Sequence, residues 1–200
     1  MTEKEIRKVS SEMEVRSLGE GEPNAIVGYA LKFNRWSDTL GGWFREILEP
    51  ESLRDADMNN VVALFNHDDS KILGRVGKNL ELTVDEIGLR FEVTPTNTTY
   101  AKDLMENIRS GIVSQCSFAF SIPDEKGAEE WRKADDGIME RRIKRINRIY
   151  DVSPVTTPAY PDTDVIISPR SKELAKEVRN TEPIVDTYEL EVMKMEAELM

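Results

Sequence analysis

Residues 112–122, IVSQCSFAFSI, decide the fold around them, because they read as a β-strand with two unlike faces. Side chains alternate across a strand, so one face holds the large apolar groups together with Ser114 and Cys116. The other face holds small and polar side chains, including Ser117. The apolar face should pack into the core, where a small cysteine is a common filler. The alternation therefore predicts a strand that buries Cys116 and presents Ser117.

Two residues of this strand are candidate nucleophiles. A cysteine buried among apolar groups has a raised pKa and is inert, which makes Cys116 a poor nucleophile. A serine on a strand is most often only a polar surface residue. The pattern by itself therefore leaves open whether Ser117 has a chemical role.

A helix and a series of strands are predicted on either side of this stretch. Residues 96–111 change to helical spacing, with Thr98 or Thr99 as the cap and Gly111 as the end. Period-2 runs bounded by turn residues predict the strands. These lie at residues 24–33, 43–47, 61–65, 72–76, 80–84 and 88–94, the last three as an antiparallel meander, and at 138–155 as one strand or two.

His67 is the only histidine in the chain, and it follows the strand predicted at 61–65. A serine nucleophile needs a base near neutral pKa, and imidazole is the usual one. Alternatively, His67 is a solvated loop residue beside Asp68 and Asp69. The hypothesis that these three residues form a metal site is weak, because consecutive side chains cannot all turn toward one ion without other ligands.

The composition limits the classes of protein to consider. The 200 residues fit one domain with tails, and a net charge of -11 disfavours direct binding of nucleic acid. No apolar run reaches the roughly 20 residues that span a bilayer, and Met1 is not followed by a secretory signal. One cysteine cannot form an internal disulfide, which favours a reducing cytoplasm. One histidine excludes a metal site that needs two or more imidazoles. No metal or cofactor is expected.

The two ends of the chain differ from its centre. Residues 1–22 are charged and end in turn-forming residues, which predicts a short N-terminal tail. Residues 23–168 form the predicted domain, and residues 169–200 an acidic, helical C-terminal arm. Such an arm could dock on the helices of a partner protein.

Three blocks of the sequence together carry a family resemblance. LFNHDDSKILGRVG, GIVSQCSFAFSI and IYDVSPVTTPAYPDT, in this order and at these spacings, resemble the prohead (capsid maturation) protease family of tailed phages. That family is similar to the assemblin proteases of herpesviruses, whose histidine and serine segments have the same order. The resemblance covers about residues 24–168. It implies an α+β fold, a mostly antiparallel β-barrel with surrounding helices, in a serine endopeptidase; the helical C-terminal arm lies outside the residues that carry the resemblance.

The resemblance also assigns site residues. The family histidine falls on His67 and the nucleophile on Ser117, 50 residues later. Assemblin relatives have a second histidine as the third member, and this chain has none, so a carboxylate is expected to orient His67. Glu140 is the first choice and Asp151 the second. Arg141 and Arg142 are candidate oxyanion donors, whose alternative role is that of a solvated strand face.

The biological setting follows from the same resemblance. It implies cleavage of scaffold protein, or of the scaffolding segment of the major capsid protein, inside the immature capsid in the host cytoplasm. Self-cleavage and a homo-oligomer are also expected, with no membrane partner. The alternative is a non-enzymatic capsid assembly or scaffolding protein with the same fold, against which the presence of both His67 and Ser117 argues.

Overall fold

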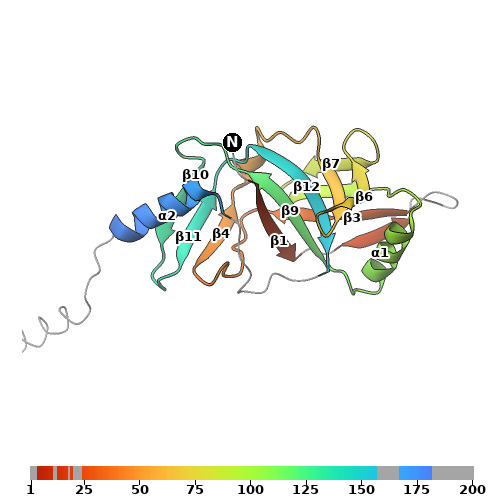
Figure 1. Cartoon of the computed structure of the whole chain (residues 1–200), viewed down its shortest axis with the longest axis horizontal. Helices are drawn as coiled ribbons and strands as arrows, with labels where there is room; N and C mark the ends of the chain where they lie inside the picture. Colours follow the sequence, from red (N-terminus) through yellow and green to blue (C-terminus); the bar gives the residue numbers. More distant parts are fainter. Residues whose placement is uncertain (1–3, 11–12, 18, 20–23, 157–166, 182–200) are drawn as a thin grey trace, which may run out of the picture.

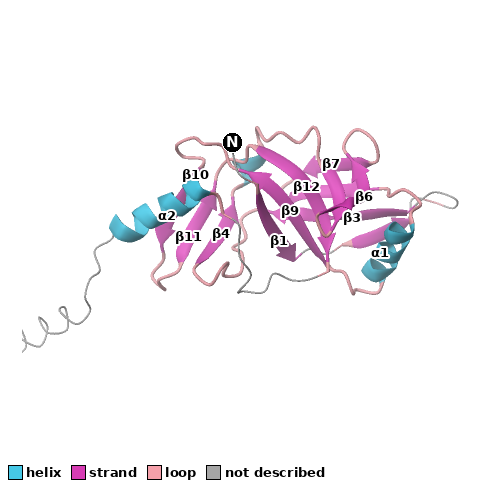
Figure 2. Ribbon diagram, in the orientation of Figure 1, coloured by secondary structure: helices cyan, strands magenta, loops and turns pink. Residues whose placement is uncertain are grey.

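The computed structural model describes residues 4–10, 13–17, 19, 24–156 and 167–181. These residues form an α+β structure made mostly of strands (Figures 1 and 2). The strands are β1 (Glu5–Ser10), β2 (Glu14–Ser17), β3 (Asn24–Lys32), β4 (Phe44–Leu48), β5 (Val62–Phe65), β6 (Asp68–Arg75), β7 (Leu80–Val84), β8 (Gly88–Val93), β9 (Gln115–Ser121), β10 (Glu129–Lys133), β11 (Met139–Ile143) and β12 (Arg148–Val155). The helices are α1 (Thr99–Arg109), α2 (Pro169–Thr181) and the 3₁₀ helix η1 (Pro50–Leu53).

The largest sheet has the strand order β1-β9-β12-β5-β6. Strand β9 is antiparallel to both β1 and β12, while β12 is parallel to β5. Figure 1 shows β9 and β12 running side by side through the middle of the molecule. Because β12 lies between β9 and β5, it is the strand that can reach both the serine strand and the histidine hairpin.

A second sheet, β2-β3-β8-β7, contributes to the main hydrophobic core. Helix α1 buries Ala101, Leu104 and Ile108, which lie on one face at helical spacing. Full burial of each leucine, isoleucine or phenylalanine stabilises the fold by about 1.5–3 kcal/mol. The core includes Ile26, Leu31, Leu89, Phe91, Phe118 and Phe120.

The third sheet is small and carries its own cluster of apolar side chains. Its order is β10-β11-β4, and α2 lies beside it at the opposite end of the molecule from α1 (Figure 1). Trp131 stacks on Trp43 with ring centroids 5.7 Å apart, and Phe44, Met139, Ile167 and Ala175 complete the cluster. This end of the molecule is therefore built by residues far apart in the sequence.

The predicted fold class is confirmed at the level of α+β with mostly antiparallel sheets, but the predicted barrel is wrong. Each sheet of the described strands has two edges, so none of them closes. The strand predicted at 72–76 pairs with β5 instead of continuing a meander. Residues 138–155, predicted as one strand or two, form two strands, and these lie in different sheets. Hydrophobic periodicity defines strands but not their partners, which explains these differences.

The N-terminal residues differ from the predicted tail, since β1 and β2 both belong to sheets. Strand β1 escapes detection because the buried side chains among its described residues, Glu5 and Arg7, are charged and not apolar. At the other end, α2 agrees with the predicted helical start of the arm, whereas residues 182–200 lie outside the described residues. Within the described part of the chain, every helix is too short or too polar to cross a membrane.

Candidate active site

A two-residue hairpin turn positions His67. Strands β5 and β6 close around the pair Phe65 and Asp68, with Asn66 and His67 between them. Both turn residues have positive φ, 58° and 57°, as the turns that match hairpin twist require. Asparagine and histidine enter this region more readily than most residues, at a cost of about 1–3 kcal/mol each. His67 therefore lies in a tight turn that fixes its backbone, and Asp68 already begins β6.

Asn66 attaches this turn to the end of β12. The Asn66 backbone N–H donates a hydrogen bond to the Pro154 carbonyl at 3.0 Å. The Asn66 side-chain oxygen accepts one from the Thr156 backbone N–H, also at 3.0 Å. The histidine hairpin is consequently held against the strand that carries Asp151.

His67 lies between a serine and a carboxylate. Its Nε2 is 2.6 Å from Ser117 Oγ, and its Nδ1 is 2.5 Å from Asp151 Oδ1. Ser153 donates a hydrogen bond to the same carboxylate oxygen at 3.0 Å, and Lys4 Nζ donates to Asp151 Oδ2 at 2.9 Å. Ser117, Ser153 and Lys4 therefore join His67 and Asp151 in one short chain of polar contacts.

Electrostatics keep Asp151 in its charged form. Burial by itself raises the pKa of this carboxyl, but the hydrogen bond and charge of His67 and those of Lys4 outweigh it and hold the pKa below its ordinary value. An ionised carboxylate only accepts hydrogen bonds, so Nδ1 of His67 carries a hydrogen. In the neutral imidazole, Nε2 is then free to accept the Ser117 proton, which is the arrangement of a Ser–His–Asp triad.

A break in strand register accompanies the position of Asp151. The pairing of β12 with β9 shifts between Ile149 and Asp151, and it then places Ser153 opposite Ser117. Such bulges change the direction in which side chains point and are frequent beside active sites. Asp151 and Ser153 are two residues apart, and they share the face of the sheet that carries Ser117.

The predicted contact between Glu140 and His67 is wrong. Glu140 lies on β11, in a different sheet from His67, and its carboxylate binds Arg45 at 2.6 Å and also Arg132. Asp151, the second choice, is the carboxylate that contacts His67. Sequence spacing could not distinguish them, because both lie on predicted strands after the serine.

The two arginines considered as oxyanion donors also lie elsewhere. Arg141 is fully buried among carboxylates from β1, β4 and β10, and its nearest partners are Glu5 and Glu129. Arg142 is half-exposed and faces Glu49 at 3.9 Å, which agrees with its alternative role on a solvated strand face. Neither position supports the predicted role.

The serine strand agrees only partly with the face analysis. Cys116 is buried as predicted, and this burial raises its pKa to about 12, so the thiol stays protonated. Ser117, predicted to be presented, is fully buried, because β1 pairs with β9 and places Lys8 opposite it. Ser114 precedes the strand and is exposed, contrary to the prediction that it shares the buried face of Cys116.

Metal ligands do not gather around this site. Across the described ranges, no group of three or more histidine, cysteine, aspartate or glutamate side chains is placed to hold a metal ion. The chemistry that the site offers is proton transfer between a hydroxyl, an imidazole and a carboxylate.

Comparison with known proteins gives one match. A family model described as caudovirus prohead serine protease matches residues 11–178, a range that contains His67, Ser117 and Asp151. The searches of curated proteins and of solved structures return no match. The matched range begins after β1.

Proposed function

Because the chain belongs to the caudovirus prohead serine protease family, we propose that it is a serine endopeptidase acting inside an immature phage capsid. Its substrates are the scaffold protein or the scaffolding segment of the capsid protein. The observation that carries the proposal is the series of short contacts from Asp151 through His67 to Ser117. A hydroxyl within reach of an imidazole, itself oriented by a carboxylate, is the arrangement that activates a serine nucleophile.

The mechanism assigns one role to each residue. Ser117 Oγ attacks the scissile carbonyl while His67 Nε2 accepts its proton. Asp151 holds the Nδ1 hydrogen and stabilises the imidazolium that forms. His67 then returns the proton to the leaving amine, which departs and leaves an acyl ester on Ser117. A water molecule, deprotonated by His67, hydrolyses the ester and restores the serine.

The finer points of the family resemblance belong to the same proposal. They are self-cleavage, assembly as a homo-oligomer, and relatedness of the fold to the assemblin proteases. The prohead interior supplies both kinds of substrate at high local concentration, which suits an enzyme that acts only after assembly.

Co-expression with the cognate scaffold and capsid proteins tests the proposal. Mass spectrometry should find shortened scaffold or capsid protein with the parent chain and full-length proteins with Ser117→Ala. Ser114→Ala is the matched control, because Ser114 is an exposed serine three residues away. Full-length substrates with all three chains would contradict the protease function and favour the non-enzymatic assembly protein.

A further inference from the structure

Strand β1 covers the serine from the open edge of the largest sheet. It pairs only with β9 in that sheet, and Lys8 lies opposite Ser117 in the register. Figure 1 shows β1 lying next to β9, close to the start of the chain. Ser117 is 0% exposed as a result, so a substrate cannot reach it while β1 is in place.

The backbone of β1 competes for the proton of the nucleophile. Ser117 Oγ lies 2.9 Å from the Arg7 carbonyl oxygen and 2.6 Å from His67 Nε2. A hydroxyl has one hydrogen and can donate it to only one of these acceptors. Lys4, just before β1, also binds Asp151. This segment therefore places a peptide carbonyl beside the nucleophile, which is what an extended substrate must do.

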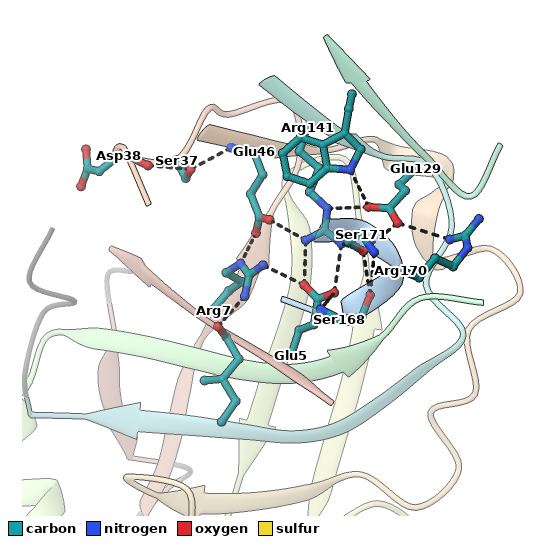
Figure 3. A network of polar contacts seen from close by, with 12 residues as sticks. Glu5, Arg7, Ser37, Asp38, Glu46, Glu129, Arg141, Ser168, Arg170 and Ser171 are labelled. Atoms are coloured by element: carbon teal, nitrogen blue, oxygen red, sulfur yellow. Dashed lines mark hydrogen bonds and ion pairs between the residues drawn. The ribbon is translucent and has the colours of Figure 1, made fainter. Parts of the chain in front are cut away.

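The opposite face of β1 enters a buried network of charged groups (Figure 3). Glu5 accepts two hydrogen bonds from the Arg141 guanidinium, at 2.7 and 3.0 Å. Arg7 forms an ion pair with Glu46, with Nε 2.6 Å from Oε1, and binds Glu5 at 2.7 Å. Glu46 and Arg141 are at most 2% exposed. The network thus receives one acidic and one basic side chain from β1, two residues apart.

Charge pairs, more than apolar packing, hold β1 in place. Of its described side chains, only Ile6 is apolar, and it is half-buried. A departing β1 would leave the Glu46 carboxylate and the Arg141 guanidinium buried without these partners, which is costly. Another strand with the same two charges at the same spacing would restore both pairs. Strand β9 would supply the main-chain hydrogen bonds, as sheet edges do when they bind extended peptides.

We infer that β1 occupies the binding site of the substrate strand, and that this site takes an extended peptide with a carboxylate and, two residues later, an arginine. Arg141 receives the carboxylate and Glu46 the arginine, so these residues determine specificity. The Arg7 guanidinium lies over the Phe120 ring, with Cζ 5.7 Å from the ring centroid. A planar guanidinium stacks on an aromatic ring better than an ammonium does, so this position should prefer arginine to lysine. One part of the inference rests on the proposed protease function, namely that the peptide bound in this site is a substrate. The enzyme is closed until β1 leaves.

The test severs β1 after the chain has folded. The recognition sequence of an unrelated site-specific protease is inserted between Ser11 and Glu12, which lie outside the described residues. The full chain, carrying Ser117→Ala, is cut and freed of the fragment by gel filtration. Rebinding of a fluorescent peptide of residues 1–11 is then measured by anisotropy. Peptides with Glu5→Ala or Arg7→Ala should bind about thirtyfold more weakly or worse. Lys8→Ala, the exposed control on the same strand, should stay within about threefold.

The same cut in the chain that keeps Ser117 should raise cleavage of the cognate scaffold about tenfold or more, and the parent peptide should inhibit it. Equal binding of all peptides, or equal cleavage by cut and uncut chains, would overturn the inference and leave the protease function intact. A stripped chain that unfolds, as seen by circular dichroism, would also overturn it, because β1 would then be integral to the fold. If the peptides bind with the expected order of affinities but the cut chain cleaves no scaffold, the protease function would be contradicted. The peptide-binding site at the edge of β9 would then still be supported.

Discussion

The chemistry of this chain depends on which groups can reach the single imidazole. His67 contacts Ser117 on one nitrogen and Asp151 on the other, whereas Glu140 is neutralised by arginines in another sheet. A hydroxyl becomes a nucleophile only when a base within hydrogen-bond reach can accept its proton. Cys116, intrinsically the more reactive residue type, is excluded by burial, because its thiolate is too costly to form.

Replacement of the nucleophile is the most direct prediction at this scale. Ser117→Ala should lower kcat by about 10⁶-fold, as loss of the nucleophile does in other serine proteases. Cys116→Ala should keep measurable activity, because a protonated buried thiol takes no part in the reaction. Hydrolysis of purified scaffold, followed by gel densitometry, measures both. An inactive but folded Cys116→Ala beside an active Ser117→Ala would make the assignment wrong.

The orienting carboxylate gives a second prediction. Asp151→Asn should lower kcat by about 10⁴-fold, because an amide favours the wrong imidazole tautomer and does not stabilise the imidazolium. Glu140→Gln should change kcat by less than about threefold, since Glu140 lies apart from the reacting groups. The two variants are matched, each converting one buried carboxylate to an amide. Equal losses of activity would mean that Asp151 is not the single carboxylate that orients His67.

At the scale of elements, charged side chains determine how the N-terminal strand, the small sheet and α2 meet. Arg141 on β11 binds Glu5 of β1, Glu129 of β10 and Ser171 of α2. Burial by itself would lower the pKa of Arg141, but the surrounding carboxylates outweigh it and raise the pKa, so the guanidinium stays charged. Removal of a buried cation from such a group is costly, because three buried carboxylates share it.

Removal of that cation should destabilise the fold. Arg141→Met should lower the free energy of unfolding by about 3–5 kcal/mol, because it removes the buried cation that Glu5, Glu46 and Glu129 share. Arg142→Met, one residue away on a half-exposed side chain, should change it by about 0.5 kcal/mol or less. Urea denaturation followed by tryptophan fluorescence measures the difference. Similar midpoints for the two variants would show that the network contributes little.

At the scale of the whole molecule, three sheets of different strand order determine the position of the site. The largest sheet brings together residues separated by as many as 147 positions, Lys4 and Asp151. The small sheet and α2 form the other end of the molecule, and the buried network joins them to β1. Whether β1 is in place at the edge of the largest sheet therefore affects the stability of a region that is distant from it in the sequence.

This linkage predicts a pH dependence of stability. Burial by itself raises the pKa of Glu5, but the charge and hydrogen bond of Arg141, with Arg7, outweigh it and hold the pKa below its ordinary value. As pH falls, the unfolded chain therefore binds the proton first, and the contribution of Glu5 to stability is lost. That contribution is complete above the ordinary glutamate pKa of about 4.3 and declines as pH falls through the lower folded value.

Comparison of the parent with Glu5→Gln isolates this effect from the other carboxylates. The difference in the free energy of unfolding should be largest above pH about 5 and should shrink as the pH is lowered. Urea titrations at a series of pH values measure it. A difference that does not change with pH would mean that Glu5 has the same pKa in the folded and unfolded chains, so that Arg141 and Arg7 do not lower it.

The C-terminal arm gives a prediction for assembly. Residues 182–200 follow α2 in the sequence and are acidic in balance, a composition that favours pairing with basic helices of a scaffold protein. Removal of these residues, with α2 retained, should lower the amount of protease copurifying with proheads and leave hydrolysis of isolated scaffold unchanged. Quantitative mass spectrometry of purified proheads measures the first effect. Unchanged incorporation would contradict docking through this arm.

Side-chain periodicity and the family blocks were enough to predict much of the local structure and two of the three residues of the candidate site. Periodicity predicted β3, β5, β7, β8, β9 and α1, because side-chain alternation is a local property of the backbone. His67 and Ser117 followed from a chain with one imidazole and from the order of the family blocks. Burial of Cys116 was predicted from the apolar face that it shares.

The remaining features could be assigned only from the three-dimensional arrangement, because they depend on which strands become neighbours. The choice of Asp151 over Glu140 required the placement of β12 in the sheet of β9 and of β11 in another. The exposure of Ser117 was predicted wrongly because β1, with charged residues at its buried positions, has no hydrophobic pattern to reveal it. Strand pairing and buried charge networks join residues that are distant in the sequence, and no local pattern of side chains encodes them.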